Sequence, residues 1–281
     1  MLIVDAQVHI WGADTPDRPW PPGRAADAQK PYPVTKDLVL AGMREAGVDR
    51  VVIVPPSWEG DRNDLALEAA RLHPDRFAVM GRLALDRPES RALVADWKTQ
   101  PGMLGMRFTF HASRQGRWLT DGTADWLWPA VERAGIPVMV SAAGALPLVD
   151  TIAERHPGLR LVVDHMGIRS GLTGDEAFAG IPELCRLARH PNVAVKSSAL
   201  PCYSVEPYPF RDVHPHVRRV HDAFGPQRMF WGTDWTRLPC PWWQAVTLFT
   251  EELRWVPAVD LAWIMGRGVC EWLGWPLPAA T

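Results

Sequence analysis

Short apolar segments recur eight times along the chain, and each is followed by a longer segment with helical spacing. Several of the apolar segments are continuous runs of Val, Ile and Leu, as expected for parallel strands buried on both faces. Eight strand-and-helix units predict an α/β fold with a closed parallel barrel. The predicted strands are Leu2–Val8, Arg50–Val54, Phe77–Gly81, Leu104–Phe108, Pro137–Ser141, Arg160–His165, Val193–Ser197 and Met229–Asp234.

The phrases REAGVDRVVIV and ERAGIPVMV each combine the end of a helix, a glycine turn and a strand. An open doubly wound sheet is the alternative, but no GxGxxG or GxxxxGK[ST] motif follows the first strand. The 281 residues slightly exceed the roughly 250 of one barrel, and no change in composition marks a boundary. We therefore expect one (β/α)₈ TIM-barrel domain over residues 1–281. The predicted helices are Thr35–Glu45, Asn63–His73, Glu89–Lys98, Ala124–Ala134, Ala145–Arg155, Ile181–Arg189, His216–Ala223, 242–253 and 260–273.

Charge and cysteine content limit the class of partner and the compartment. The chain has 30 basic and 32 acidic residues and a net charge of −2, which gives no electrostatic reason to expect nucleic acid or an anionic membrane. Its beginning, MLIVDAQVHIW, is not typical of a signal peptide. The four cysteines are widely spaced and are expected to be reduced thiols. These features predict a cytoplasmic protein with a small-molecule substrate, and a homodimer is common for such proteins.

Polar residues stand where several of the predicted strands end. Alternation along the first strand places Gln7 and His9 on one face, and later strands end near Arg107, His165 and Asp234. In a barrel the carboxyl ends of the strands form the active face. Two long loops, 12–34 and 199–215, are expected at the same face. Because buried charges are costly unless paired, this convergence predicts a functional site.

Four motifs, DAxxHxW, GxRF, VVDHMG and WGTDW, resemble the amidohydrolase superfamily and, within it, the lactonase branch. That branch includes lactonases for 2-pyrone-4,6-dicarboxylate and for rhamnono- and fucono-lactone. The sequence departs from the family at two places. The usual His-x-His motif is Gln7-Val-His9 here, and the fifth strand ends at Ser141 where metal-dependent relatives carry a histidine. The resemblance therefore implies a member that works without metal.

The resemblance also implies roles for the residues that match. We expect Asp234 to be the general base that activates water for the opening of a lactone or similar activated ester. Trp231 and Trp235 flank it and are expected to raise its pKa. His9 and His165 are expected to polarise the carbonyl. If a single divalent metal, zinc or manganese, is bound, its ligands are expected to be these two histidines and Asp234.

Further residues are expected to bind the substrate. The planar guanidinium of Arg107 suits a substrate carboxylate, and its alternative is a structural ion pair with Asp234. The other predicted contacts are Gln7, Ser141, Trp235 and Tyr203. Asp5 and Asp164 are expected to anchor the motif residues.

Several features have open interpretations. Arg114 and Arg117 are either near the substrate or in a solvated loop. His214, His216 and His221 fit a surface helix better than a site, and Trp242-Trp243 either walls the pocket or packs between helices. Two other functions stay open: a metal-dependent decarboxylase or hydratase acting on an aromatic acid, and a barrel that only binds.

Overall fold

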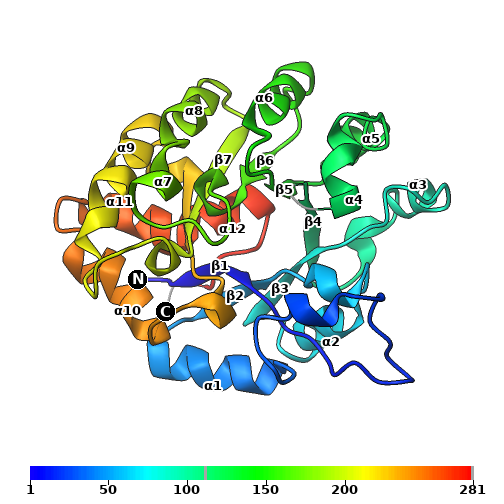
Figure 1. Ribbon diagram of the computed structural model, residues 1–281, viewed down its shortest axis with the longest axis horizontal. Coiled ribbons are helices and arrows are strands. Elements are labelled where there is room, and N and C mark those ends of the chain that lie inside the picture. The colour runs from blue at the N-terminus through cyan, green and yellow to red at the C-terminus, as the bar shows by residue number, and fades with distance from the viewer. Residues whose placement is uncertain (111–112, 280–281) are drawn as a thin grey trace.

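The computed structural model describes residues 1–110 and 113–279, with the side chains of all of these except 113 and 114. In this range eight parallel strands pair in chain order, from β1 to β8, and helices surround them (Figure 1). The (β/α)₈ barrel predicted from the sequence is confirmed. The strands are β1 Val4–Val8, β2 Arg50–Ile53, β3 Phe77–Gly81, β4 Met103–Thr109, β5 Val138–Ser141, β6 Leu161–Val163, β7 Val193–Ser198 and β8 Met229–Gly232.

The barrel is nearly closed because the last strand approaches the first. The backbone amide of Asp234 donates to the carbonyl oxygen of Gln7 at 2.8 Å. Gly232 permits this approach, because a Cβ atom there would lie 3.2 Å from the backbone nitrogen of Ala6. The final strand thereby carries its C-terminal end directly against β1.

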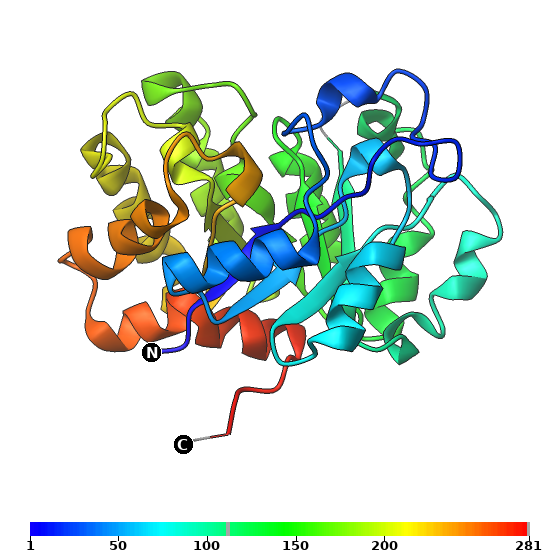
Figure 2. The same ribbon diagram turned by 90° about the horizontal axis from the view of Figure 1, so that it is seen from below.

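Side chains on the strands divide into an inner and an outer core. Those that point inward, including Val4, Val52 and Met139, form one buried cluster with residues of the C-terminal helix, such as Leu273. The other face of each strand packs against the surrounding helices. Figure 2 shows the C-terminal helices across the end of the barrel where β1 begins, and the loop after β1 at the opposite end. The C-terminal helices therefore cover the end of the barrel where the strands begin. The carboxyl ends of the strands lie at the other end.

The helices agree with most of the predictions. Thr35 caps α1, where its side chain accepts a hydrogen bond from the amide of Leu38, and α1 ends at Gly47 with φ of 72°. The helix predicted over Glu89–Lys98 is instead split into a short helix and a 3₁₀ turn, Trp97–Thr99. The helices are α1 Lys36–Ala46, α2 Asp64–Leu72, α3 Ser90–Leu93, α4 Ser113–Gly116, α5 Leu127–Arg133, α6 Leu146–Arg155, α7 Gly174–Phe178, α8 Ile181–Arg186, α9 His214–Phe224, α10 Trp242–Thr247, α11 Ala258–Ala262 and α12 Gly268–Leu273. No helix within the described ranges has the length and apolar character that a bilayer crossing needs.

Three irregularities at strand ends shape the functional side of the barrel. The pairing of β1 with β2 shifts by one residue between Asp5 and Val8, and such a bulge re-aims side chains. β6 and β8 end earlier than predicted, because His165 and Asp234 have left-handed backbones with φ of 52° and 53°. That conformation costs a non-glycine residue about 1–3 kcal/mol and is concentrated at functional sites.

Candidate active site

A cavity of about 140 Å³ lies at the C-terminal ends of the strands. That volume is close to that of a cavity which accommodates a single six-membered ring. The predicted residues His9, Arg107, Ser141, His165 and Asp234 all line it. The other described residues that line it are Gln29, Ser57, Trp58, Thr109, Ile168, Ser170 and Arg237.

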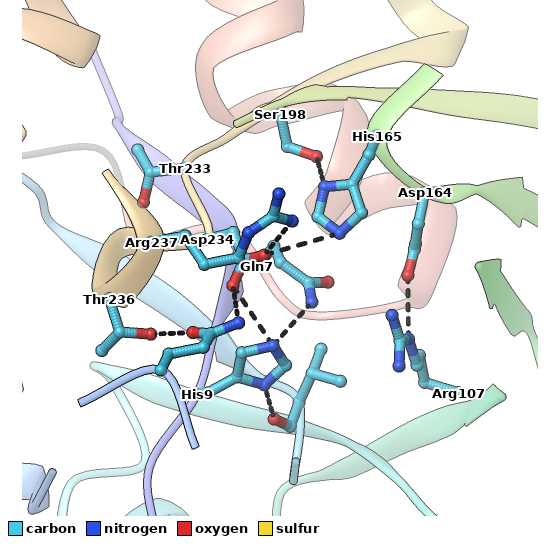
Figure 3. A network of polar contacts seen from close by, with 12 residues as sticks. Gln7, His9, Arg107, Asp164, His165, Ser198, Thr233, Asp234, Thr236 and Arg237 are labelled. Atoms are coloured by element: carbon cyan, nitrogen blue, oxygen red, sulfur yellow. Dashed lines mark hydrogen bonds and ion pairs between the residues drawn. The ribbon is translucent and has the colours of Figure 1, made fainter. Parts of the chain in front are cut away.

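His9 and Asp234 are in direct contact in this cavity (Figure 3). Nε2 of His9 lies 3.2 Å from Oδ1 of Asp234. On the other side of the ring, Nδ1 lies 2.6 Å from the carbonyl oxygen of Val54, which can only accept. Nδ1 therefore donates to this carbonyl oxygen, and Nε2 faces the carboxylate of Asp234.

The second oxygen of Asp234 has its own cationic partner. Nη1 of Arg237 lies 3.0 Å from Oδ2, and Nε2 of His165 lies 3.8 Å from the same oxygen. Burial alone would raise the pKa of Asp234, but His9 and Arg237 hold it well below its ordinary value. The expectation that Trp231 and Trp235 raise this pKa is wrong.

His165 is a neutral imidazole in this environment. Burial lowers its pKa to about 3, although Asp234 and Asp164 act in the opposite direction. Its Nδ1 lies 2.8 Å from the hydroxyl oxygen of Ser198. If Ser198 donates to Nδ1, the ring hydrogen is on Nε2, which faces the carboxylate of Asp234. This tautomer gives the cavity a neutral hydrogen-bond donor beside the ionised carboxylate.

Beneath the cavity, Asp164 is held between two cations. Oδ1 lies 2.6 Å from Nζ of Lys196, and Oδ2 lies 2.9 Å from Nε of Arg107. Burial raises the pKa of Asp164, but Lys196 and Arg107 more than offset it and bring it to about 2. The alternative in which Arg107 pairs with Asp234 is wrong, because its guanidinium is fixed by Asp164 and by the hydroxyl of Thr109.

Gln7 shares a face with His9, as the strand alternation predicted, but it lies below the cavity. Its side chain is fully buried, and Nε2 lies 3.4 Å from Nε2 of His9. Its side-chain oxygen, Oε1, accepts a hydrogen bond from Nζ of Lys196. Gln7 is therefore not on the cavity wall, and it reaches the site only through its contact with His9.

Two other predicted contacts also lie away from the cavity wall. Trp235 stacks on Trp242 with ring centroids 4.8 Å apart and packs toward Gly42 of α1. Tyr203 is buried and meets Phe178 edge to face. Both rings fill space between the barrel and its outer helices, so we no longer expect them to touch the substrate.

Arg237 and Gln29 also contact Asp234, and neither is predicted above from the sequence. Arg237 is three residues after Asp234 in a 3₁₀ turn, and that spacing was an available signal for an ion pair. Gln29 comes from the loop 12–34 and donates from Nε2 to Oδ1 of Asp234 at 3.4 Å. No local pattern singles it out, because its contact spans 205 positions of the chain.

The remaining candidates are outside the site. The histidines of α9 have separate partners: His214 contacts the carbonyl oxygen of Pro209, His216 stacks on Phe178, and His221 pairs with Asp260. The surface-helix interpretation is therefore confirmed.

The tryptophan pair and Arg117 also do not line the cavity. Trp242 donates to Asp5 at 3.0 Å, so it packs against the barrel, whereas Trp243 is exposed. Arg117 is not on the cavity wall, and the side chain of Arg114 lies outside the described residues.

Asp5 is the structural anchor that was expected. It accepts hydrogen bonds from the amides of Gln7 and Thr233, from the Thr233 hydroxyl and from Trp242. Burial nevertheless raises its pKa to about 7. It joins β1 to the end of β8 next to Asp234.

The donor set does not fit a metal ion well. Among the side chains that the structure describes, no group of three or more His, Cys, Asp or Glu is arranged to hold one. Oδ1 of Asp234 is engaged by His9, and Oδ2 by the fixed positive charge of Arg237. A divalent cation would have to displace both contacts and lie beside a guanidinium.

The eight-stranded barrel thus presents His9, His165 and Asp234 together in one cavity at the carboxyl ends of its strands. The chain belongs to the amidohydrolase family, whose model matches residues 4–266. It is 29% identical over 241 residues to an L-fucono-1,5-lactonase of Burkholderia ambifaria, covering 83% of this chain and 79% of that protein. It is 28% identical over 264 residues to a 2-pyrone-4,6-dicarboxylate hydrolase of Comamonas testosteroni, covering 83% of this chain and 76% of the other.

Solved structures agree on the fold. A zinc-bound amidohydrolase of Burkholderia multivorans superposes with a TM-score of 0.80 at 22% identity, covering 98% of this chain and all (100%) of that one. The resemblance to this family, inferred above from four motifs, is confirmed.

Proposed function

We propose that this protein hydrolyses a lactone, using water activated by Asp234 and no metal. The observation that carries the proposal is the approach of His9 and His165 to the two oxygens of one ionised carboxylate. The similarity to two proteins named as a lactonase and a pyrone dicarboxylate hydrolase supports the same bond type. The lactone ring fits a cavity of about 140 Å³.

In the proposed reaction, water forms a bond to the carbonyl carbon while Asp234 accepts its proton. The carbonyl electrons move to oxygen, where the Nε2 hydrogen of His165 stabilises the oxyanion. The ring C–O bond then breaks, and the leaving alkoxide takes the proton from Asp234. The product is a hydroxy acid.

The low pKa of Asp234 has opposite effects on the two halves of this reaction. A weakly basic carboxylate activates water poorly, but its protonated form is a strong acid that readily protonates the alkoxide. An alkoxide within a strained ring needs less assistance than an amine leaving group. A lactone is therefore a better match to this site than an amide.

Fixed cations supply the positive charge of the proposed site. Arg237 neutralises Oδ2 of Asp234, and Lys196 and Arg107 flank Asp164 below the cavity. Charges that are already in place can stabilise the negative charge that develops in the reaction. They do so without a metal-bound water that must first lose a proton. No observation in the described residues favours the decarboxylase or the binding-only alternative.

The test is hydrolysis of sugar, aryl and carboxylated lactones by chelator-treated enzyme. We expect turnover to survive treatment and to fall about 10²–10⁴-fold in Asp234→Asn. Asp222→Asn is the matched control, because this side chain is 65% exposed on α9. Activity that disappears with the chelator and returns with zinc or manganese would contradict the metal-free mechanism. Unchanged turnover in Asp234→Asn would contradict the role of that residue.

A further inference from the structure

A second cavity adjoins the proposed active site. It is lined by the segment that follows β1, and its walls include Trp11, Trp20 and Tyr32, several prolines and alanines, and the charged residues Asp14 and Lys30. Its volume is about 480 Å³, which exceeds the roughly 140 Å³ of the cavity beside Asp234. Long ordered loops at this end of a barrel usually contribute to ligand recognition.

Gln29 joins the two cavities, because it lines both. Its Nε2 contacts Oδ1 of Asp234 at a long 3.4 Å, and its Oε1 accepts from the hydroxyl of Thr236. A ligand that reaches past Gln29 would extend from the reacting centre into the second cavity.

The walls of the second cavity indicate what it binds. Two indole rings, a phenol ring and the rings of Pro31 and Pro33 offer apolar surface. Rigid aromatic walls favour flat, apolar groups. The indole N–H of Trp20 is buried and has no hydrogen-bond partner within the described residues.

We propose that this second cavity is a subsite for an aromatic or similarly apolar arm attached to the lactone ring. The inference rests on the proposed function, because the ring that carries the arm must lie beside Asp234. It narrows the substrate from lactones in general to lactones with a ring substituent of about one phenyl group or more. Burial of a phenyl group in such a site should improve binding by about 10-fold or more.

The experiment compares two ligand pairs. Turnover is measured with δ-valerolactone and its 6-phenyl derivative. Binding is measured by calorimetry with the two corresponding lactams, which resist hydrolysis. We expect the wild-type protein to favour the phenyl compound about 10-fold in both measurements.

Two substitutions locate the preference. Trp20→Ala removes an aromatic wall, and Ala28→Phe fills the cavity from its own lining. Each should reduce the phenyl preference to about 2-fold or less while leaving the unsubstituted ligands unaffected. Trp243→Ala is the control, since this tryptophan is exposed on α10 and lines neither cavity, and it should keep the full preference.

The outcomes separate the two proposals. Hydrolysis of both lactones at equal efficiency would overturn the subsite and leave the lactonase proposal intact. A phenyl preference in lactam binding without any lactone turnover would overturn the lactonase proposal and support the subsite. A preference that survives both cavity variants, or no binding of either lactam, would overturn the subsite.

Discussion

The ammonium of Lys196 lies 2.6 Å from Oδ1 of Asp164, and both side chains are entirely excluded from solvent. The same ammonium donates a hydrogen bond to the side-chain oxygen Oε1 of Gln7. The side-chain nitrogen Nε2 of Gln7 contacts His9. One buried ion pair therefore supports both Arg107 on one side of the cavity and His9 on the other.

Lys196→Met keeps the length of the side chain and removes the charge. Asp164 then keeps only one of its two cationic partners, and breaking a buried pair in this way costs about 3–5 kcal/mol. We expect that loss in the free energy of unfolding measured by urea denaturation. Lys98→Met, at an exposed position, should change it by about 0.5 kcal/mol or less. Equal stability of the two variants would show that the buried pair contributes nothing.

His165 predicts a pH dependence of stability. Its pKa is about 3 in the folded protein and ordinarily 6.5, so between these values the unfolded chain binds more protons. His165 therefore does not lower the free energy of unfolding above pH 6.5. Below that pH it lowers the free energy of unfolding by up to about 1.4 kcal/mol per pH unit. Melting curves between pH 7 and 4.5 should show a steeper loss in the wild type than in His165→Asn, a replacement that tolerates the left-handed backbone. Parallel curves would contradict a neutral buried His165.

Ser198 is expected to set the tautomer of His165. In Ser198→Ala the ring loses the hydrogen bond on Nδ1, and kcat should fall about 2- to 10-fold, the worth of one hydrogen bond, with little change in KM. Ser198→Thr keeps the hydroxyl and should recover activity. Ser197→Ala is a close control, because this neighbouring hydroxyl is buried and has no hydrogen-bond partner among the described residues. A loss of the same size in Ser197→Ala would point to strand packing instead.

Arg107 predicts a preference for acidic substrates. In Arg107→Lys the positive charge beside Asp164 remains, but the planar fork that can hold a carboxylate is lost. We expect KM for carboxylated lactones to rise about 10-fold, while neutral lactones are turned over as before. The ratio of kcat/KM for a matched acid and its amide measures this directly. If both substrates weaken equally, Arg107 is a structural partner of Asp164 and does not select the substrate.

The barrel and the strands that carry the site can be predicted from the pattern of residues along the chain. Alternating apolar strands and amphipathic helices leave few ways to bury both faces of a parallel sheet. His9, Arg107, His165 and Asp234 could be found for the same reason, since polar residues at the ends of buried strands must meet at one face. The helix capped at Thr35 and ended at Gly47 is equally local in origin.

The contacts of each polar group, and therefore the charge of the site, depend on how distant segments pack together. Trp235 is adjacent to Asp234 in sequence, yet it packs outward on Trp242, whereas Gln29 reaches Asp234 from a distant loop. The pKa of Asp234 is lowered rather than raised, because His9 and Arg237 outweigh burial. The side-chain contacts of the site and the electrostatic field at Asp234 depend on distances between segments that are far apart in the chain. A shift of one residue in the pairing of β1 is also enough to turn a side chain to the other face of the strand.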